Sequence, residues 1–277
     1  MPLFVLVIIM AVAQGVAEFL PVSSSGHLLV LGNWFGFDAE ANMLLNVVLH
    51  AGTLLAILVF YFSKLLSILL EPARRRLIAL VIIGSIPAGV AGVGLKALKL
   101  EEKIFSSPWV AALGFIITGT MLLAVFGKPW RSEETGDAAD AVPAEKMSFL
   151  QAVLIGVAQA LAITPGISRS GSTISVGVLS KLRKADAAEF SFLLAIPAIG
   201  GAALLEFADV CKEGIGSGLA GQGGVLLLGF AISACVGYAS LAGLIAMLRR
   251  GKLGWFAIYL YVAALIVIGV QTWKFFN

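Results

Sequence analysis

The sequence has little charge for its length. Asp, Glu, Lys and Arg make up 13% of its 277 residues, whereas a soluble domain carries about 25%. Hydrophobic residues make up 60%, and the mean hydropathy is +1.01. This composition excludes an ordinary soluble domain. Because apolar stretches of helical length are the means by which most chains cross a bilayer, we expect an all-α polytopic membrane protein.

Cysteine and clustered basic residues are also scarce, and each scarcity excludes a class of function. Cys211 falls in a predicted loop and Cys235 in a predicted span, so a disulfide between them is not expected, and no Cys/His spacing typical of a metal site occurs. No basic face is interleaved with aromatics, which excludes nucleic acid as a partner. No Lys or Arg precedes the first apolar run, so a cleaved signal peptide is not expected.

Six apolar runs are close to the ~20 residues that a transmembrane helix needs. They cover residues 41–62, 77–97, 108–127, 188–206, 225–248 and 255–275. Two further pairs of apolar segments, within 3–35 and 149–180, have arms too short to span and are interrupted by Pro, Gly and Ser. Such pairs are typical of re-entrant helical hairpins, which enter the membrane and leave it on the same side.

A polar string occurs twice, once in each predicted hairpin. Residues 14–27 read QGVAEFLPVSSSGH, and residues 159–172 read QALAITPGISRSGS. With an offset of 145 positions, 7 of the 18 residues from 11 to 28 are identical in both copies. The repeat predicts two halves, 1–127 and 148–277, joined by a hydrophilic linker at 128–147 that is expected on the cytoplasmic side. Each half contains one hairpin and three spans, and an odd number of spans gives the second half an inverted topology.

The distribution of basic residues predicts the orientation. With both chain ends outside, the inside loops hold 13 of the 19 Lys and Arg residues. The outside loops, around 36–40, 98–107 and 207–224, and the chain ends hold 5, which are Lys96, Lys99, Lys103, Lys212 and Lys274. The inside residues are Lys64, Arg74, Arg75, Arg76, Lys128, Arg131, Lys146, Lys181, Arg183, Lys184, Arg249, Arg250 and Lys252. The positive-inside rule therefore favours extracytoplasmic termini.

The two copies of the string differ at three informative positions. Glu18, Ser24 and His27 in the first copy correspond to Ile163, Arg169 and Ser172 in the second. An Arg at the bilayer centre costs ~2.5–3.5 kcal/mol on insertion scales, so these residues should have a purpose. One interpretation is that they only pair with each other and hold the halves together.

A second interpretation is a phosphate site. Ser23 to Gly26 and Ser168 to Gly171 each precede a second helical arm, and helix N-termini bind anions. A guanidinium such as that of Arg169 binds phosphate bidentately. A Ser near a His and an acid is also a pattern typical of an activated nucleophile.

The motifs resemble those of a known family. The string from Gln14 to His27 resembles the first motif of the bacterial undecaprenyl-diphosphatase family, which is linked to bacitracin resistance. The string PGISRSGST, residues 165–173, resembles its second motif. The resemblance covers essentially the whole chain. It implies an integral-membrane phosphatase of the bacterial plasma membrane that removes the terminal phosphate of undecaprenyl diphosphate and so recycles the lipid carrier of wall synthesis.

The resemblance also implies roles for residues. Glu18 would be a general base or a metal ligand, and Ser24 the nucleophile or a phosphate ligand. His27 would be the acid/base partner or the nucleophile itself, and Arg169 would clamp the diphosphate. The substrate and phosphate ligands would be Gln14, Ser23, Ser25, Gly26, Ser168, Ser170, Gly171 and Thr173.

The family resemblance further implies a divalent cation. Mg²⁺ or Ca²⁺ is expected to neutralise the diphosphate. Gln14 stands where the family often has Glu, which removes one carboxylate, but it shares a helix face with Glu18 four residues later. The sequence contains no all-protein cage for a cation.

Other assignments remain open at this level. Broken helices in an inverted repeat are also a transporter plan, so the chain could flip the monophosphate carrier instead of, or in addition to, hydrolysis. A non-catalytic lipid-binding protein is a third class. Asn46 and His50 share a helix face and serve either packing or support of the site. The expected partners are the polyprenyl diphosphate and membrane lipids, the site is expected to open outward, and a homodimer is a candidate assembly.

Overall fold

The computed structural model describes residues 2–36, 43–98, 106–127, 141–213, 221–250 and 252–276. These ranges form a helical bundle without strands, apart from one isolated β-bridge between Val142 and Leu182. The first half contains α1 (Leu3–Phe19), α2 (Ser24–Phe35), α3 (Met43–Phe60), α4 (Phe62–Leu70), α5 (Arg75–Ala97) and α7 (Pro108–Phe126). The second half contains α8 (Phe149–Leu161), α9 (Arg169–Leu179), α10 (Lys184–Glu213), α11 (Gly223–Arg249) and α12 (Trp255–Phe276).

Six of these helices are long and apolar enough to cross a membrane: α3, α5, α7, α10, α11 and α12. Each coincides with one of the six predicted spans, so the prediction of a polytopic all-α protein is confirmed. The helix α10 is longer than predicted, because its polar ends continue the helix beyond the apolar run. Cys211 consequently lies in the last turns of α10 and not in a loop.

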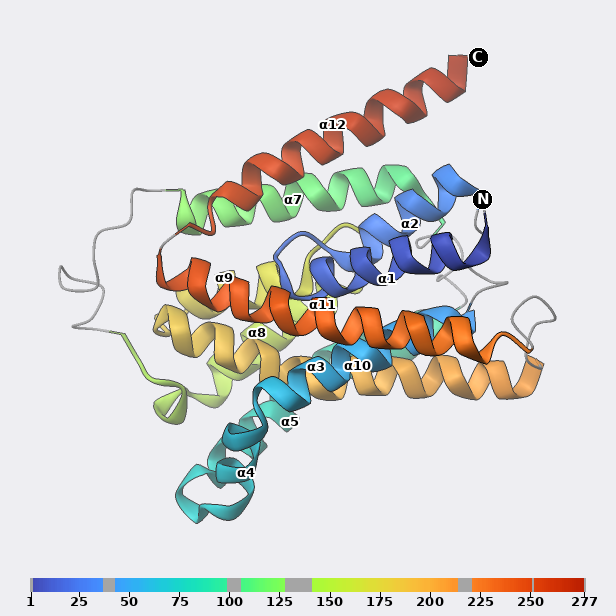
Figure 1. The fold of residues 1–277 in the computed structure, drawn as a ribbon. Helices are drawn as coiled ribbons and strands as arrows, with labels where there is room; N and C mark the ends of the chain where they lie inside the picture. The colour runs from blue at the N-terminus through green and yellow to red at the C-terminus, as the bar shows by residue number, and fades with distance from the viewer. Residues whose placement is uncertain are drawn as a thin grey trace.

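The short helix α4 was not predicted. Only Tyr61 separates it from α3, and it projects from the bundle (Figure 1). Its nine residues are too few to appear as a separate apolar window. Ile68 is buried against the bundle, and Lys64 pairs with Glu189 of α10 at 2.8 Å between Nζ and Oε1.

The helices form two hairpins, α1/α2 and α8/α9. In each hairpin, the turn between the arms lies where the repeated string contains Pro, Gly and Ser. Their tips lie in the interior of the bundle, and each hairpin starts and ends at the same end of the molecule (Figure 1). The second tip rests on α7. Gly166 there has a positive φ of 87°, and an added Cβ would lie 2.1 Å from the backbone oxygen of Ala111. Only glycine allows this conformation and this approach.

The arms of the hairpins pack against spans from the other half of the chain. The helix α1 packs on α11, and α8 packs on α5. Both contacts are very close: a Cβ on Gly156 would lie 2.1 Å from the oxygen of Gly84, and one on Gly15 would lie 2.9 Å from the nitrogen of Gly237. Small residues at such crossings let helices approach in a membrane, where packing replaces the hydrophobic effect as the force between them.

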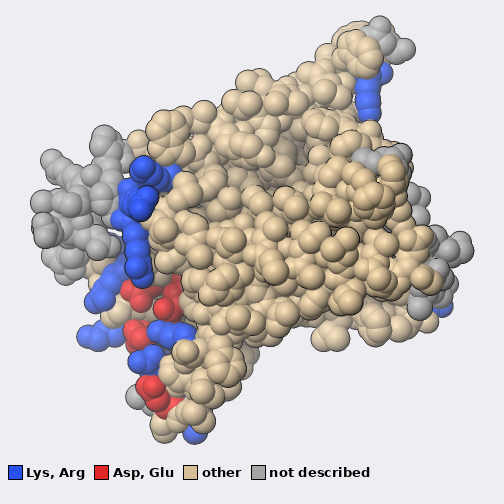
Figure 2. All heavy atoms as spheres, in the orientation of Figure 1, with Lys and Arg blue, Asp and Glu red and all other residues tan. Residues whose placement is uncertain are grey.

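Charged side chains gather at one end of the visible face, and the middle of that face carries none (Figure 2). This end includes α4 and the start of α10, which hold basic residues assigned to the inside loops. The inside residues Lys128 and Arg131, with linker positions 128–140, lie outside the described residues. The same is true of the outside residues Lys99 and Lys103 and of most of the predicted outer loops 36–40 and 98–107. The apolar middle is the part of the surface suited to lipid.

Candidate active site

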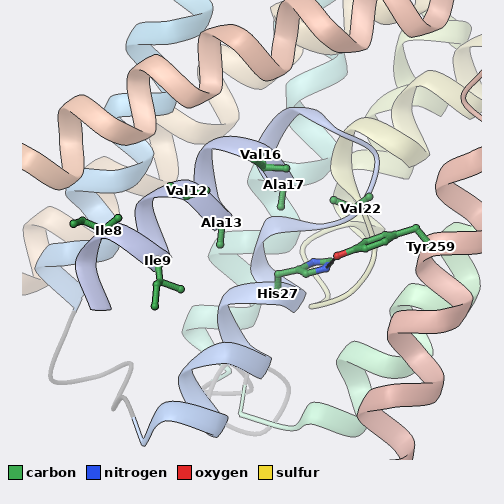
Figure 3. Close-up of a pocket in the computed structure, with 9 residues that line it drawn as sticks. All are labelled: Ile8, Ile9, Val12, Ala13, Val16, Ala17, Val22, His27 and Tyr259. Carbon is green, nitrogen blue, oxygen red and sulfur yellow. Dashed lines mark hydrogen bonds between the residues drawn. The ribbon is translucent and has the colours of Figure 1, made fainter. Parts of the chain in front are cut away.

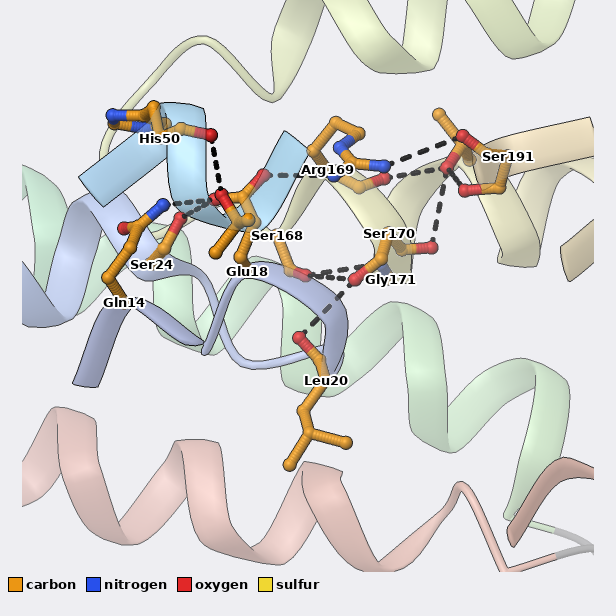
Figure 4. Close-up of polar contacts among 12 residues, drawn as sticks. Gln14, Glu18, Leu20, Ser24, His50, Ser168, Arg169, Ser170, Gly171 and Ser191 are labelled. Carbon is orange, nitrogen blue, oxygen red and sulfur yellow. Dashed lines mark hydrogen bonds and ion pairs between the residues drawn. The ribbon is translucent and has the colours of Figure 1, made fainter. Parts of the chain in front are cut away.

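Glu18, in the last turn of α1, lies at the centre of a buried polar network (Figure 4). Its Oε2 accepts hydrogen bonds from Ser24 Oγ at 2.6 Å and from Gln14 Nε2 at 3.1 Å. Its Oε1 accepts one from Arg169 Nη2 at 2.9 Å. Helical spacing places Gln14 on the same face of α1, and the turn at 20–23 brings Ser24 back to it. Both oxygens of the carboxylate are therefore engaged.

Arg169 joins the two hairpins. It is the first residue of α9, and its side chain and that of Glu18 are 14% and 7% exposed. Its Nη1 donates to the backbone oxygen of Ser191 on α10 at 3.4 Å. Thr173 Oγ1 donates to the oxygen of Arg169 at 2.7 Å and lies 2.5 Å from Ser191 Oγ. This second layer of polar contacts fixes the start of α9 and thereby the guanidinium.

The serines that precede the second arms cap those helices. Ser23 Oγ accepts from Gly26 N at 3.3 Å, and Ser168 Oγ accepts from Gly171 N at 3.1 Å. The serine two residues later is close to each cap. Ser25 Oγ lies 3.3 Å from Ser23 Oγ, and Ser170 Oγ lies 3.2 Å from Ser168 Oγ. The two N-termini thus share the same side-chain cap contacts, but the cap backbones differ, because φ is 71° at Ser23 and −74° at Ser168.

The tips are also tied together and to α7. Ser170 Oγ donates to the backbone oxygen of Leu20 in the first tip at 3.3 Å. Thr118 Oγ1 on α7 accepts from Ser168 N at 2.9 Å and donates to Gly166 O at 3.2 Å. These bonds satisfy backbone groups of irregular segments that would otherwise be unpaired inside a membrane protein.

His27 points away from this network. Its Nδ1 lies 2.8 Å from the backbone oxygen of Ser23, and its Nε2 lies 2.7 Å from the hydroxyl of Tyr259 on α12. Since a carbonyl oxygen only accepts, Nδ1 carries the proton in the neutral ring and Nε2 accepts from Tyr259. The structure therefore does not bring His27 to Ser24, and the expected Ser–His–Glu set is not assembled. The base within reach of Ser24 is Glu18.

His50 and Tyr259 lie next to the predicted residues. His50, on α3, lies near Glu18 (Figure 4). Its Nδ1 lies 2.9 Å from the backbone oxygen of Asn46. Of the two roles left open for His50, support of the site is the one this position favours. Tyr259 was missed, because it lies in an apolar span without a polar neighbour that would single it out.

The donor set does not form a resident cage for a cation. Among the described residues, no cluster of three or more His, Cys, Asp or Glu could hold a metal ion. Glu18 is the one carboxylate in the network, and both its oxygens already have partners. Gln14 Oε1 is buried without a hydrogen-bond partner among the described residues and is the remaining oxygen donor. Ca²⁺ takes six to eight oxygens, and Mg²⁺ demands octahedral geometry.

The fold and the site define a class of protein. It is an all-helical, multi-pass membrane protein in which a buried acid contacts a serine and an arginine, each at the N-terminus of a helix. The chain matches the family model of the bacitracin resistance protein BacA over residues 7–266. It belongs to this family.

Similar proteins cover nearly the whole chain. An undecaprenyl-diphosphatase of Rhodopirellula baltica is 42% identical over 262 residues, which are 95% of this chain and 96% of the relative. One of Carboxydothermus hydrogenoformans is 37% identical over 265 residues, with the same coverages of 95% and 96%. One of Rubrobacter xylanophilus is 38% identical over 275 residues, or 94% and 95%. The family predicted from the two motifs is confirmed.

Proposed function

We propose that this protein hydrolyses undecaprenyl diphosphate to undecaprenyl phosphate and phosphate, recycling the lipid carrier of wall synthesis and conferring bacitracin resistance. The observation that carries this proposal is the contact of Ser24 Oγ with Glu18 at 2.6 Å, beside the guanidinium of Arg169. Phosphoryl transfer needs a hydroxyl nucleophile, a base that accepts its proton and a positive group that binds the phosphate, which here is the guanidinium. The names of the relatives agree with this chemistry.

In the first step, Ser24 Oγ attacks the terminal phosphorus in line with the anhydride oxygen. Glu18 accepts the hydroxyl proton as the new O–P bond forms. The anhydride bond breaks, and undecaprenyl phosphate leaves with its electron pair. Arg169 turns its Nη2 from Glu18 and its Nη1 from the backbone oxygen of Ser191 toward the phosphate oxygens, where charge increases.

In the second step, water attacks the phosphoserine. Glu18, now protonated, would be the acid that returns its proton to Ser24 Oγ as that O–P bond breaks. The proton of the attacking water leaves with the phosphate. The backbone N–H groups at the start of α2 and α9 would stabilise the phosphoryl oxygens in both steps.

The divalent cation that neutralises the diphosphate remains a proposal. Because the donor set is too small for a resident site, Mg²⁺ or Ca²⁺ would enter on the diphosphate, with Glu18 and Gln14 Oε1 as oxygen ligands from the network. The remaining ligands would be phosphate oxygens and water.

We also propose the inverted repeat, with halves 1–127 and 148–277. Its support is the exchange of partners, because α1 packs on α11 while the equivalent α8 packs on α5. The plasma membrane, extracytoplasmic termini and an outward-opening site belong to the same proposal. A homodimer is a further prediction, which the mass of the protein in detergent checks.

Phosphate release by the purified protein in detergent tests the proposed function. We expect wild-type protein to release phosphate from undecaprenyl diphosphate, and Ser24→Ala protein to release none. Flipping of the monophosphate needs a bilayer, whereas hydrolysis does not. A wild-type protein that is inactive in detergent yet moves undecaprenyl phosphate across liposomes would be a transporter and would contradict the proposal.

A further inference from the structure

An apolar groove runs along α1 (Figure 3). Its volume is about 440 Å³, within the range of ~300–1,000 Å³ of ligand pockets. Six α1 residues from Ile8 to Ala17 form one wall, and Val22, His27 and Tyr259 complete it. At ~1.5 Å per residue, the wall from Ile8 to Ala17 is about 14 Å long. The groove is therefore elongated.

The groove ends beside the reactive residues. Ala17, in its wall, immediately precedes Glu18, and Val22 precedes the cap residue Ser23. His27 lies three residues after Ser24 on α2, one helical turn away. The same short segment of chain therefore carries the end of the groove on one side and the Glu18–Ser24 contact on the other.

Polarity is confined to this end of the groove. Its other lining residues are Ile, Val and Ala, whereas His27 and Tyr259 present the bonded pair of Nε2 and hydroxyl at 2.7 Å. A ligand that matches this pattern is an elongated apolar chain with a polar group at one end. A lipid diphosphate has this form, and its polar end would then lie next to Ser24.

We infer that this groove binds the isoprenoid units of the substrate nearest the diphosphate. The inference rests on the proposed function and adds a subsite to it, with the His27–Tyr259 pair marking the boundary between tail and head. The chain beyond these units would extend into the bilayer. Recognition of the first units distinguishes the substrate from short phosphate esters and from free phosphate.

A photoreactive substrate analogue tests this directly on wild-type protein. The probe is a non-hydrolysable farnesyl diphosphate analogue with a diazirine on its second isoprene unit. We expect adducts on α1 between Ile8 and Ala17 or on Tyr259, and competition by excess undecaprenyl phosphate. Adducts confined to other helices would overturn the inference. Equal labelling of α1 by a diazirine phospholipid, without competition, would show that the groove holds bilayer lipid only.

A pair of matched variants gives an independent kinetic test. Ala13→Trp fills the groove, whereas Ala202→Trp places the same side chain on an exposed position of α10. The quantity measured is the ratio of kcat/KM for farnesyl diphosphate to kcat/KM for ethyl diphosphate, which lacks the tail. We expect Ala13→Trp to lower this ratio roughly tenfold or more, as loss of pocket contacts does, and Ala202→Trp to leave it unchanged. An unaltered ratio in Ala13→Trp would overturn the inference, even where wild-type activity upholds the proposed function.

Discussion

Glu18 and Arg169 are separated by 151 residues in the chain, and their side chains form a buried ion pair with an Oε1–Nη2 distance of 2.9 Å. One residue ends the first arm of the first hairpin, and the other begins the second arm of the second hairpin. The ion pair therefore joins the two hairpins inside the bundle. It also places the guanidinium that binds phosphate next to the carboxylate that acts as the base. The two charges cancel each other while no substrate is bound.

Arg169→Ala should abolish phosphate release and destabilise the protein. The change leaves Glu18 buried without its ionic partner, which costs about 3–5 kcal/mol in measured cases. Arg169→Lys should restore little activity, because an ammonium is a point charge and does not present the planar fork of a guanidinium. Phosphate release in detergent and the thermal midpoint are the measurements.

Arg183→Lys is the matched control for Arg169→Lys. Its side chain is 59% exposed, and its contact with Asp186 is 3.9 Å long, so we expect a change near zero, as is usual for surface pairs. If Arg169→Lys kept most of the wild-type rate, the bidentate role of Arg169 would be wrong.

Ser24→Ala should remove turnover while substrate still binds. The hydroxyl that contacts Glu18 is lost, but Arg169 and the helix N-termini remain. Ser63→Ala, at an exposed position of α4, is the control and should be fully active. Rapid quenching of the wild-type reaction should give a phosphoenzyme on Ser24. A phosphoenzyme on His27, with Ser24→Ala still active, would reduce Ser24 to a phosphate ligand.

Gln14→Glu should allow the site to bind a cation in the absence of substrate. The substitution puts a second carboxylate four residues from Glu18 on one helix face, where Gln14 now donates to Glu18 at 3.1 Å. We expect Mn²⁺ binding without substrate, seen by electron paramagnetic resonance, in Gln14→Glu and not in wild type. Gln222→Glu adds an acid away from the site and should behave as wild type. Stoichiometric Mn²⁺ binding by the wild-type protein alone would refute a substrate-borne cation.

The sequence was sufficient to predict the membrane spans, but not to predict the directions in which the side chains of the site point. The length of the apolar runs alone predicted the six long helices, because a helix that crosses the hydrocarbon core of a bilayer needs about 20 apolar residues. Ser24 and His27, three residues apart on α2, face different neighbours: one contacts Glu18 and the other Tyr259. Which neighbour lies on each side depends on how α12 packs, and no local pattern encodes that. The short α4 was missed for a different reason, because nine residues give no separate apolar window.

Tyr259→Phe should weaken lipid binding more than turnover. The change removes the hydroxyl that donates to His27 Nε2 at 2.7 Å, so the imidazole at the end of the groove loses the partner that holds it. His27 Nδ1 also donates to the backbone oxygen of Ser23, the residue before Ser24. A displacement of His27 would therefore also affect the position of Ser24. We expect KM for undecaprenyl diphosphate to rise and kcat to change less.

Tyr261→Phe is the matched control on the same helix. Its hydroxyl also has a partner, Thr120 Oγ1 at 2.9 Å, but that pair lies away from the groove residues His27 and Val22. Equal changes in KM for Tyr259→Phe and Tyr261→Phe would mean that both act only through the packing of α12.

Labelling of single cysteines in intact cells decides the orientation. In a background without Cys211 and Cys235, both exposed, a membrane-impermeant thiol reagent is applied before and after permeabilisation. Asn33→Cys, near the end of α2, should react in intact cells, because the first hairpin is expected to enter from outside. Arg183→Cys, after α9, should react only after permeabilisation, because the basic loops are expected inside. Ser25→Cys, at the tip, should react from outside, since phosphate needs an aqueous path to that face. The reverse pattern would place the site toward the cytoplasm, and accessibility of Asn33→Cys and Arg183→Cys from one side would rule out the inverted repeat.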